Sequence, residues 1–326
     1  MLSQPTPKPI LWLEQVTTDL TSLVGGKGAN LGQLLHGGFP VPTGFVVTTS
    51  AFKKTLETNN LTDAIHTIEA NIDHSDLETL EIKARNIQTL ILNTKIPFDL
   101  LSLMLNAFNS LDCSLTAVRS SATMEDSITA SFAGQQNTYL NIRTSAEFID
   151  ALMNCWASLY EPRTIKYRFE KGLGELPIET GVVVQSMINS DVSGVIFTLD
   201  PVTGNSGTVT IEAIYGLGEP LVSGEITPDL YIVEKESGHI HKQIISEQTW
   251  MLKANDDYSP NQPNNVQVSI DQSAQEIPKL SGVQISQLTQ TAISIHNYYG
   301  LPQDIEWAIC ENTLYILQTR PITTVH

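Results

Sequence analysis

The stretch DIEWAICENTLYILQTRPIT, residues 304–323, predicts a β-hairpin on whose register the interpretation of the whole chain depends. Apolar residues occupy every second position of its first half, which is typical of a strand with one buried face. The same alternation puts Asp304 and Glu306 together on the opposite face. Gln318 and Arg320 likewise share one face of the returning strand.

The turn of this hairpin decides whether the two polar pairs lie side by side. A two-residue turn would pair Glu306 with Leu317. An odd-length loop or a β-bulge would instead pair Glu306 with Gln318. In that register Asp304 lies beside Arg320, carboxylate and amide oxygens could hold Mg²⁺, and the guanidinium points at a phosphate. The alternative interpretation is an ordinary salt-bridged surface hairpin.

The composition is that of an ordinary globular protein with a strongly negative charge. Of 326 residues, 41% are hydrophobic, and 18 Lys plus Arg oppose 35 Asp plus Glu to leave a net charge of −17. This charge argues against nucleic acid or an anionic membrane surface as a partner, so an anionic ligand requires a local cluster of cations. Three widely spaced cysteines, with no signal-peptide or membrane-spanning pattern, indicate a cytoplasmic protein without a disulfide framework or a zinc site.

Two segments offer such cations. Gly25-Gly26-Lys27-Gly28 precedes a predicted helix over 29–36, so that an ammonium and backbone N–H groups converge at a helix start. Arg119-Ser120-Ser121 opens a stretch of hydroxyls and small residues that runs past Gly134 and would let the backbone approach a triphosphate closely. Each segment by itself is equally well explained as a solvated turn or a polar hairpin tip.

The order of the predicted elements indicates an α+β protein. Helices are expected over 61–109 and 145–171, strands dominate the second half, and the regular alternation of a doubly wound parallel sheet is missing. Residues 1–11 are expected to form a flexible tail, and 12–326 a single domain. The polar, proline-broken segment 253–282 is expected to be a mobile surface insertion.

Six blocks resemble, in this order, the N-terminal nucleotide-binding domain of phosphoenolpyruvate synthase, pyruvate phosphate dikinase and rifampin phosphotransferase. They are LVGGKGANLGQLL (23–35), FPVPTGFVVTTSAF (39–52), AVRSSATMEDSITASFAGQQNTYLNI (117–142), GVIFTLDPVTGN (194–205), EAIYGLGEPLVSGEITPDLY (212–231) and DIEWAICENTLYILQTRPIT (304–323). The resemblance covers nearly the whole chain. It implies an ATP-grasp fold in which ATP and Mg²⁺ lie between two lobes, about 12–187 and 188–326.

The resemblance also implies a catalytic and metal-binding set. Lys27 and Arg119 would bind the phosphates of ATP. Glu306 and Gln318 would ligate Mg²⁺. Arg320 would stabilise the transferring group.

A second set of residues would complete the nucleotide site. Ser120 and Gly134 belong to the segment that contacts the phosphates. Gln185 and Met187 would lie at the adenine edge, and Glu212 near the ribose or the hinge.

These expectations describe an ATP-binding, Mg²⁺-dependent phosphotransferase module that is incomplete on its own. In the family a histidine of a swivelling domain accepts a phosphoryl or pyrophosphoryl group, and this chain ends at His326, so the histidine is expected on a separate protein. One alternative is a non-catalytic ATP-binding regulatory subunit. Others are the nucleotide domain of a rifampin-type antibiotic phosphotransferase that acts with a partner, and a fragment of a longer enzyme.

Overall fold

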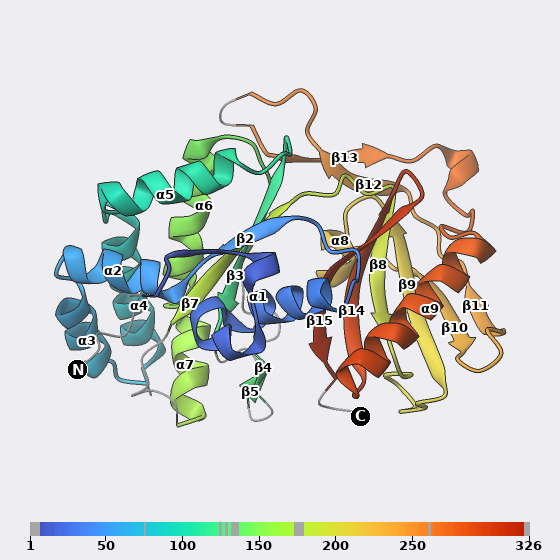
Figure 1. Cartoon of the computed structure of the whole chain (residues 1–326), viewed down its shortest axis with the longest axis horizontal. Coiled ribbons are helices and arrows are strands. Elements are labelled where there is room, and N and C mark those ends of the chain that lie inside the picture. The colour runs from blue at the N-terminus through green and yellow to red at the C-terminus, as the bar shows by residue number, and fades with distance from the viewer. Residues whose placement is uncertain are drawn as a thin grey trace. The chain divides into compact units, whose positions relative to one another are not determined.

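The computed structural model describes residues 7–74, 76–123, 126–127, 130–131, 137–172, 179–259 and 262–322 (Figure 1). The chain divides into two compact units. The first unit contains Met1–Gln33 and Thr43–Ser186, and the second contains Leu34–Pro42 and Met187–His326. No helix in the described ranges has the length and apolar character needed to cross a membrane.

The first unit is built on an antiparallel sheet with strands in the order β1-β2-β7-β3-β6. These strands are β1 (Ile10–Trp12), β2 (Gly44–Val47), β3 (Thr116–Ala122), β6 (Thr138–Ile142) and β7 (Thr180–Ser186), and a separate short pair is formed by β4 (Asp126–Ser127) and β5 (Ala130–Ser131). The helices are α1 (Thr21–His36), α2 (Thr49–Thr58), α3 (Thr62–Ala70), α4 (Leu77–Leu92), α5 (Phe98–Asn109), α6 (Ser145–Ser158) and α7 (Pro162–Glu170). Single turns of 3-10 helix cover Leu13–Gln15 and Thr18–Leu20.

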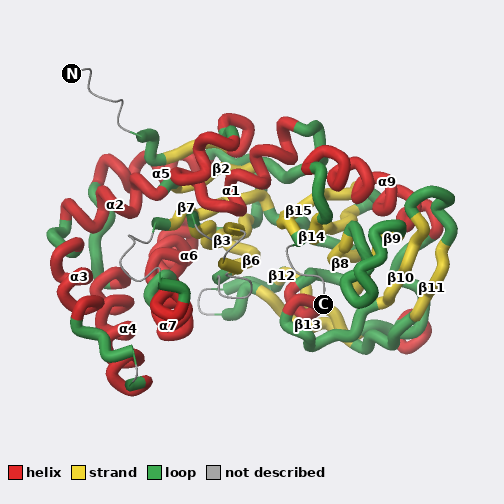
Figure 2. Tube along the Cα trace, turned by 90° about the horizontal axis from the view of Figure 1, so that it is seen from below, coloured by secondary structure: helices red, strands yellow, loops and turns green. Residues whose placement is uncertain are grey.

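One face of this sheet forms the core of the first unit. Helices α2 to α7 gather on that side (Figure 2), where they bury Phe45, Val118 and Val184 in one continuous apolar cluster. Because side chains alternate across a strand, the neighbours of Val118 on β3 point to the other face. Arg119 is one of them, and it shares that second face with the buried Val183 of β7 and Val46 of β2.

The second unit contains a sheet with strands in the order β11-β10-β9-β8-β14-β15. Its strands are β8 (Val192–Phe197), β9 (Thr208–Tyr215), β10 (Asp229–Glu234), β11 (Ile240–Ile244), β14 (Gln303–Cys310) and β15 (Thr313–Pro321). A separate hairpin is formed by β12 (Trp250–Ala254) and β13 (Asn265–Ser269). The helices are α8 (Glu219–Val222) and α9 (Gly282–Tyr299), with a 3-10 turn at Gln272–Ala274.

Helix α9 covers one face of the second sheet (Figure 1). On β8 that face carries Ile196, which is fully buried, and Thr198 follows it two residues later at the end of the strand. Thr198 Oγ1 and His296 Nδ1 of α9 are 3.1 Å apart and share a hydrogen bond, which identifies the face that α9 covers. The buried Ile305 and Trp307 of β14 belong to the same apolar layer, so Asp304 and Glu306 lie on the face turned away from α9.

The α+β class expected from the sequence is confirmed, and three local predictions are corrected. The helix expected over 145–171 is two helices, because the chain turns after Ser158 and Pro162 starts a new helix at its first position. The helix expected over 29–36 begins at Thr21 and is broken at Gly25, so the glycines lie within α1. The segment 253–282 contains most of the hairpin β12–β13, whose apolar alternation is too short to stand out among polar residues.

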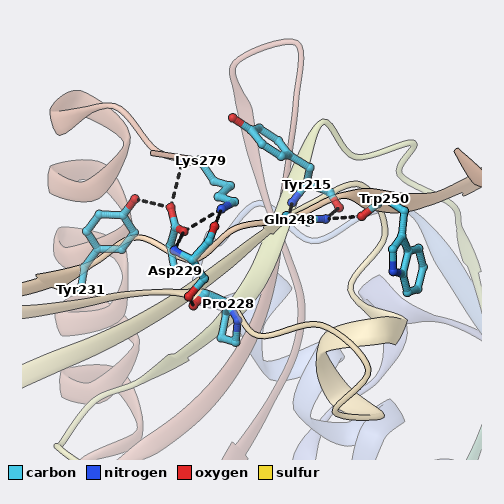
Figure 3. Close-up of polar contacts among 8 residues, drawn as sticks. Tyr215, Pro228, Asp229, Tyr231, Gln248, Trp250 and Lys279 are labelled. Atoms are coloured by element: carbon cyan, nitrogen blue, oxygen red, sulfur yellow. Dashed lines mark hydrogen bonds and ion pairs between the residues drawn. The ribbon is translucent and has the colours of Figure 1, made fainter. Parts of the chain in front are cut away.

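A buried ion pair ties the segment before α9 to the sheet (Figure 3). Lys279 Nζ lies 2.8 Å from Asp229 Oδ1, and both side chains are fully buried. The Asp229 carboxylate also accepts hydrogen bonds from the backbone N–H groups of Lys279 and Ser246 and from the Tyr231 hydroxyl. Because each carboxylate oxygen has donors, the charge is compensated inside the protein.

A buried glutamine fastens the hairpin β12–β13 next to this ion pair. The Gln248 side chain accepts from the Tyr215 N–H at 2.8 Å and donates to the Tyr215 carbonyl at 3.1 Å (Figure 3). Its amide thus pairs with the backbone of β9 as a residue of an adjacent strand would. It also donates to the Trp250 carbonyl at 2.9 Å. The 246–281 segment is therefore held by specific buried polar contacts.

The Lys279→Met substitution should destabilise the protein by about 3–5 kcal/mol, because it leaves the Asp229 charge buried without its counter-charge. Urea unfolding at neutral pH measures this loss. Lys242→Met, at an exposed position of β11, is the matched control and should change the free energy of unfolding by less than about 0.5 kcal/mol. Equal effects of the two substitutions would contradict a stabilising role of the ion pair.

Candidate functional site

In the first unit, the glycine-rich segment forms a break inside α1. Gly25 has φ of 74° and ψ of 175°, so the helix restarts immediately after it, and Lys27 stands in the first turn of the restarted part. A Cβ on Gly25 would lie 1.9 Å from the Ser121 carbonyl oxygen of β3, which only glycine permits. The start of this half-helix is therefore pressed against the strand that carries Arg119. Its first N–H groups and its dipole favour an anion.

Arg119 and Gln185 share the face of the first sheet that is turned away from the helical core. Arg119 on β3 is paired with Val183 on β7, and Gln185 is paired with Ala117, two residues along the same two strands. Paired residues of antiparallel strands point to the same side, so both side chains lie on the face against which α1 packs. The structure thus brings together Arg119, Gln185 and the start of the restarted helix.

Ser120 points the other way. It is paired with Val182, which belongs to the helical core, and its hydroxyl lies 3.4 Å from the Asn137 carbonyl. The hydroxyl on the face of Arg119 is that of Ser121, two residues along the strand. The alternation of a strand is the signal that distinguishes these two serines, and it becomes usable once β3 is known to continue to Ala122.

Lys27 is almost completely buried, with 7% of its surface exposed. Its ammonium acts on the Cys155 thiol of α6: burial raises the pKa of that thiol, and the nearby positive charge of Lys27 lowers it in part. A buried cation on a helix start that lies against the strand of Arg119 is the kind of local positive charge that an anionic ligand requires in a chain of net charge −17.

Two further candidate residues are less informative. Gly134 lies outside the described residues. Met187 follows β7 directly, is partly exposed and belongs to the second unit.

In the second unit, four strands align the remaining candidate residues in two adjacent rows. Glu212 on β9 is paired with Val195 on β8, which is paired with Glu306 on β14, which is paired with Gln318 on β15. The neighbouring row ends in Asp304 paired with Arg320. Because paired residues point to one side, both rows lie on the face opposite α9.

A β-bulge produces this alignment. The hairpin has a two-residue turn, Glu311 and Asn312, both with positive φ (49° and 62°). Trp307 is paired with Ile316 and Glu306 with Gln318, so Leu317 is the extra residue of the bulge. The turn is the two-residue one considered from the sequence, and the bulge restores the register that brings the polar pairs together.

The polar face of the second sheet concentrates negative charge. Nε and Nη2 of Arg320 both lie 2.7 Å from Asp304 Oδ2. Burial raises the pKa of Asp304, the Arg320 guanidinium lowers it, and the Glu306 charge raises it again. Burial also raises the pKa of Glu212, and the Asp304 charge adds to this. Three carboxylates with one guanidinium therefore leave a local excess of negative charge that a divalent cation would neutralise.

The donor set fits Mg²⁺. Oε1 of Gln318 is buried and has no hydrogen-bond partner among the described residues, although a buried amide oxygen normally has one. Within the described residues, no three His, Cys, Asp or Glu side chains form a metal cage by themselves. Mg²⁺ is usually held by one or two protein oxygens together with phosphates and water, so Glu306 and Gln318 with a phosphate ligand suffice.

Fold and site together define a nucleotide-binding module. The family model described as "Pyruvate phosphate dikinase, AMP/ATP-binding domain" matches residues 21–326, and the chain belongs to this family. This agrees with the α+β, ATP-grasp class expected from the sequence, and it supports ATP with Mg²⁺ as the ligand pair.

Similar proteins carry the names expected from the sequence. A probable phosphoenolpyruvate synthase of Methanothermobacter thermautotrophicus is 38% identical over 98% of this chain and 46% of its own length. One of Archaeoglobus fulgidus is 40% identical over 97% of this chain and 42% of its own length. A rifampicin phosphotransferase of Streptomyces sviceus is 35% identical over 99% of this chain and 37% of its own length. The chain thus spans less than half the length of these relatives.

Among solved structures, D-alanine-D-alanine ligase from Helicobacter pylori covers 67% of this chain and 45% of its own, with 13% sequence identity and a TM-score of 0.25. A likeness this weak does not bear on the fold.

Deletion of Leu317 should leave the protein folded and able to bind Mg²⁺ and ATP, because Leu317 is the extra residue of the bulge and its removal still pairs Glu306 with Gln318. Deletion of Thr319 is the matched control: it moves Arg320 to the α9 side and should abolish Mg²⁺-dependent binding. Calorimetric titration of both variants measures this. Equal loss in both would contradict the assigned bulge.

Glu212→Gln should raise stability at neutral pH in the absence of ligand. Because the folded chain raises the pKa of Glu212, the stability linked to this group is present at low pH and is lost as the pH rises through the raised value. The glutamine variant lacks this loss, so the melting temperatures of the wild type and of Glu212→Gln should converge in acid and separate toward neutral pH. Glu236→Gln, at an exposed position, is the control. Parallel curves for Glu212→Gln and the wild type would overturn the expectation.

Proposed function

We propose that this chain binds ATP with Mg²⁺ and transfers a phosphoryl or pyrophosphoryl group to a histidine of a separate swivelling domain or protein in the cytoplasm. The observation that carries this proposal is the bulge-set alignment of Glu306 with Gln318 and of Asp304 with Arg320 on one sheet face. A surface hairpin stabilised by salt bridges has no need for a buried amide oxygen that finds no hydrogen-bond partner among the described residues.

The first unit supplies the contacts to the phosphates. Lys27 and Arg119 place two positive charges beside the restarted half of α1, whose N-terminus favours anions. A buried ammonium interacts with a phosphate more strongly than an exposed one, because less water screens the charge.

The second unit supplies the metal ligands and the charge that acts on the transferring group. Glu306 and Gln318 would hold Mg²⁺, which when bound neutralises phosphate charge. Arg320 would stabilise the negative charge of the group in transfer, and Asp304 holds its guanidinium in place through two contacts of 2.7 Å. Catalysis by such a site consists of positioning and charge stabilisation.

The remaining candidates would hold the rest of the nucleotide. Gln185 and Met187, at the end of β7, would contact the adenine edge. Glu212, two strands from Glu306, would contact the ribose. Ser120 and Gly134 would contribute to the segment around the phosphates, Ser120 through its backbone because its side chain faces the core.

In this scheme the partner that carries the histidine also determines the final acceptor of the group. Phosphoenolpyruvate synthases and a rifampicin phosphotransferase are both similar to this chain, so pyruvate and a rifampicin-type antibiotic are the two acceptors to test. Unphosphorylated histidine domains of each kind, supplied as separate proteins together with ATP and Mg²⁺, distinguish them. A regulatory subunit without catalysis would bind ATP and phosphorylate neither.

The Glu306→Ala variant should bind ATP at least tenfold more weakly in the presence of Mg²⁺ and lose the effect of Mg²⁺, because it removes a metal ligand. Arg320→Ala should abolish transfer to the histidine domain while the chain remains folded. Calorimetric titration with a non-hydrolysable ATP analogue, followed by transfer of labelled phosphate, measures both effects.

The control for these variants is Glu236→Ala, which removes an exposed carboxylate of the same unit. Full transfer activity in Arg320→Ala would refute the catalytic assignment. Lys27→Ala and Glu306→Ala, each titrated with the ATP analogue and Mg²⁺, test whether residues of both units bind the same nucleotide: a loss of affinity in only one of the two variants would argue against it.

A further inference from the structure

Ser121 makes two buried hydrogen bonds that cross the break in α1. Its hydroxyl donates to the Val24 carbonyl at 2.7 Å, just before the break, and accepts from the Gly28 N–H at 3.1 Å, just after it. The side chain is completely buried. The serine and the helix segment are more than 90 residues apart in sequence.

The second of these hydrogen bonds caps the restarted half of α1, and a residue of strand β3 supplies the cap. In many helices the residue before the first turn accepts a hydrogen bond from the second or third helical N–H group through its own side chain. Here Gly25 occupies that position and Gly28 is the third residue after it. Gly25 has no side chain to offer, and it cannot have one because a Cβ would lie 1.9 Å from the Ser121 carbonyl oxygen.

The same geometry ties the helix start to the face that carries Arg119. Ser121 is paired with Gly181 of β7, and a Cβ on Gly181 would lie 2.6 Å from the Val24 carbonyl oxygen. Two glycines therefore let α1 approach the sheet closely, and the Ser121 hydroxyl determines where along the strand it docks. Arg119 stands two residues before Ser121 on the same face.

From these contacts we infer that Ser121 is a positioning residue for the triphosphate. Its hydroxyl fixes the first turn of the restarted helix, and with it Lys27, at one place relative to Arg119. This inference rests on the proposed function, since it assigns to Ser121 the alignment of the two cations that are proposed to bind phosphates. Ser121 itself contacts no phosphate in this scheme, because its single O–H donor is already used by the Val24 carbonyl.

The test compares ligands that differ in the number of phosphates. Adenosine, AMP, ADP and a non-hydrolysable ATP analogue are titrated with Mg²⁺ into the wild type and Ser121→Ala. We expect the ATP analogue to bind the variant roughly tenfold more weakly, since a buried N–H group loses its partner and the helix start is displaced. Adenosine should bind within about twofold of the wild type, and AMP and ADP in between.

Ser158→Ala is the matched control. It also removes a buried serine hydroxyl of the first unit, which donates to the Cys155 carbonyl at 2.8 Å in α6. A purely structural effect lowers the melting temperature of both variants without a dependence on phosphate number. Ser121→Cys keeps the side-chain size but replaces oxygen with a weak acceptor, and should show the same ranking of ligands if the alanine variant does not fold.

The outcomes separate the two proposals. Failure of the wild type to bind the ATP analogue overturns the proposed function. Wild-type binding with an equal loss for all four ligands, or with no loss in Ser121→Ala, overturns the positioning role alone. A loss that grows with the number of phosphates in the Ser121 variant, and not in Ser158→Ala, supports it.

Discussion

The pairing of β14 with β15 is the constraint on which the polar site of the second unit depends. Side chains alternate with a period of two, so a shift of one residue would carry Gln318 and Arg320 into the apolar layer under α9. The extra residue Leu317 prevents this shift while the two-residue turn keeps Trp307 in the core. One bulge therefore satisfies both the packing of the buried face and the alignment of the polar face.

The first unit reaches a comparable arrangement by a different physical route. There the absence of side chains at Gly25 and Gly181 allows a helix backbone to lie directly on the sheet. The polar groups exposed by the helix break are then satisfied by a serine of the strand. In both units a helical layer buries one face of a sheet, and the charged candidates occupy the other face. This segregation lets a chain with a large net negative charge keep the helix start of Lys27 against the strand of Arg119.

Much of the architecture could be predicted because it depends on local patterns. Alternation along the terminal hairpin placed Asp304 with Glu306, and helical spacing identified most of the helices. Other features could not be predicted because they depend on partners far apart in sequence. The break in α1 exists because β3 lies against Gly25, and the side chain of Ser121, rather than that of Ser120, lies on the Arg119 face because of the β3–β7 register. The ion pair of Asp229 with Lys279 joins residues 50 positions apart and has no signature in the sequence.

The amino-acid sequence by itself determined the α+β class, the family and the residue types available for binding phosphate and metal, because these follow from periodicity, motif and charge. The tertiary structure decided which of those residues share a face. It selected the register of Glu306 with Gln318, turned Ser120 toward the core and set the helix start of Lys27 against the strand of Arg119. These choices depend on a single bulge and on close backbone contacts between distant segments, whose energies come from packing and hydrogen bonds that no local stretch of sequence contains.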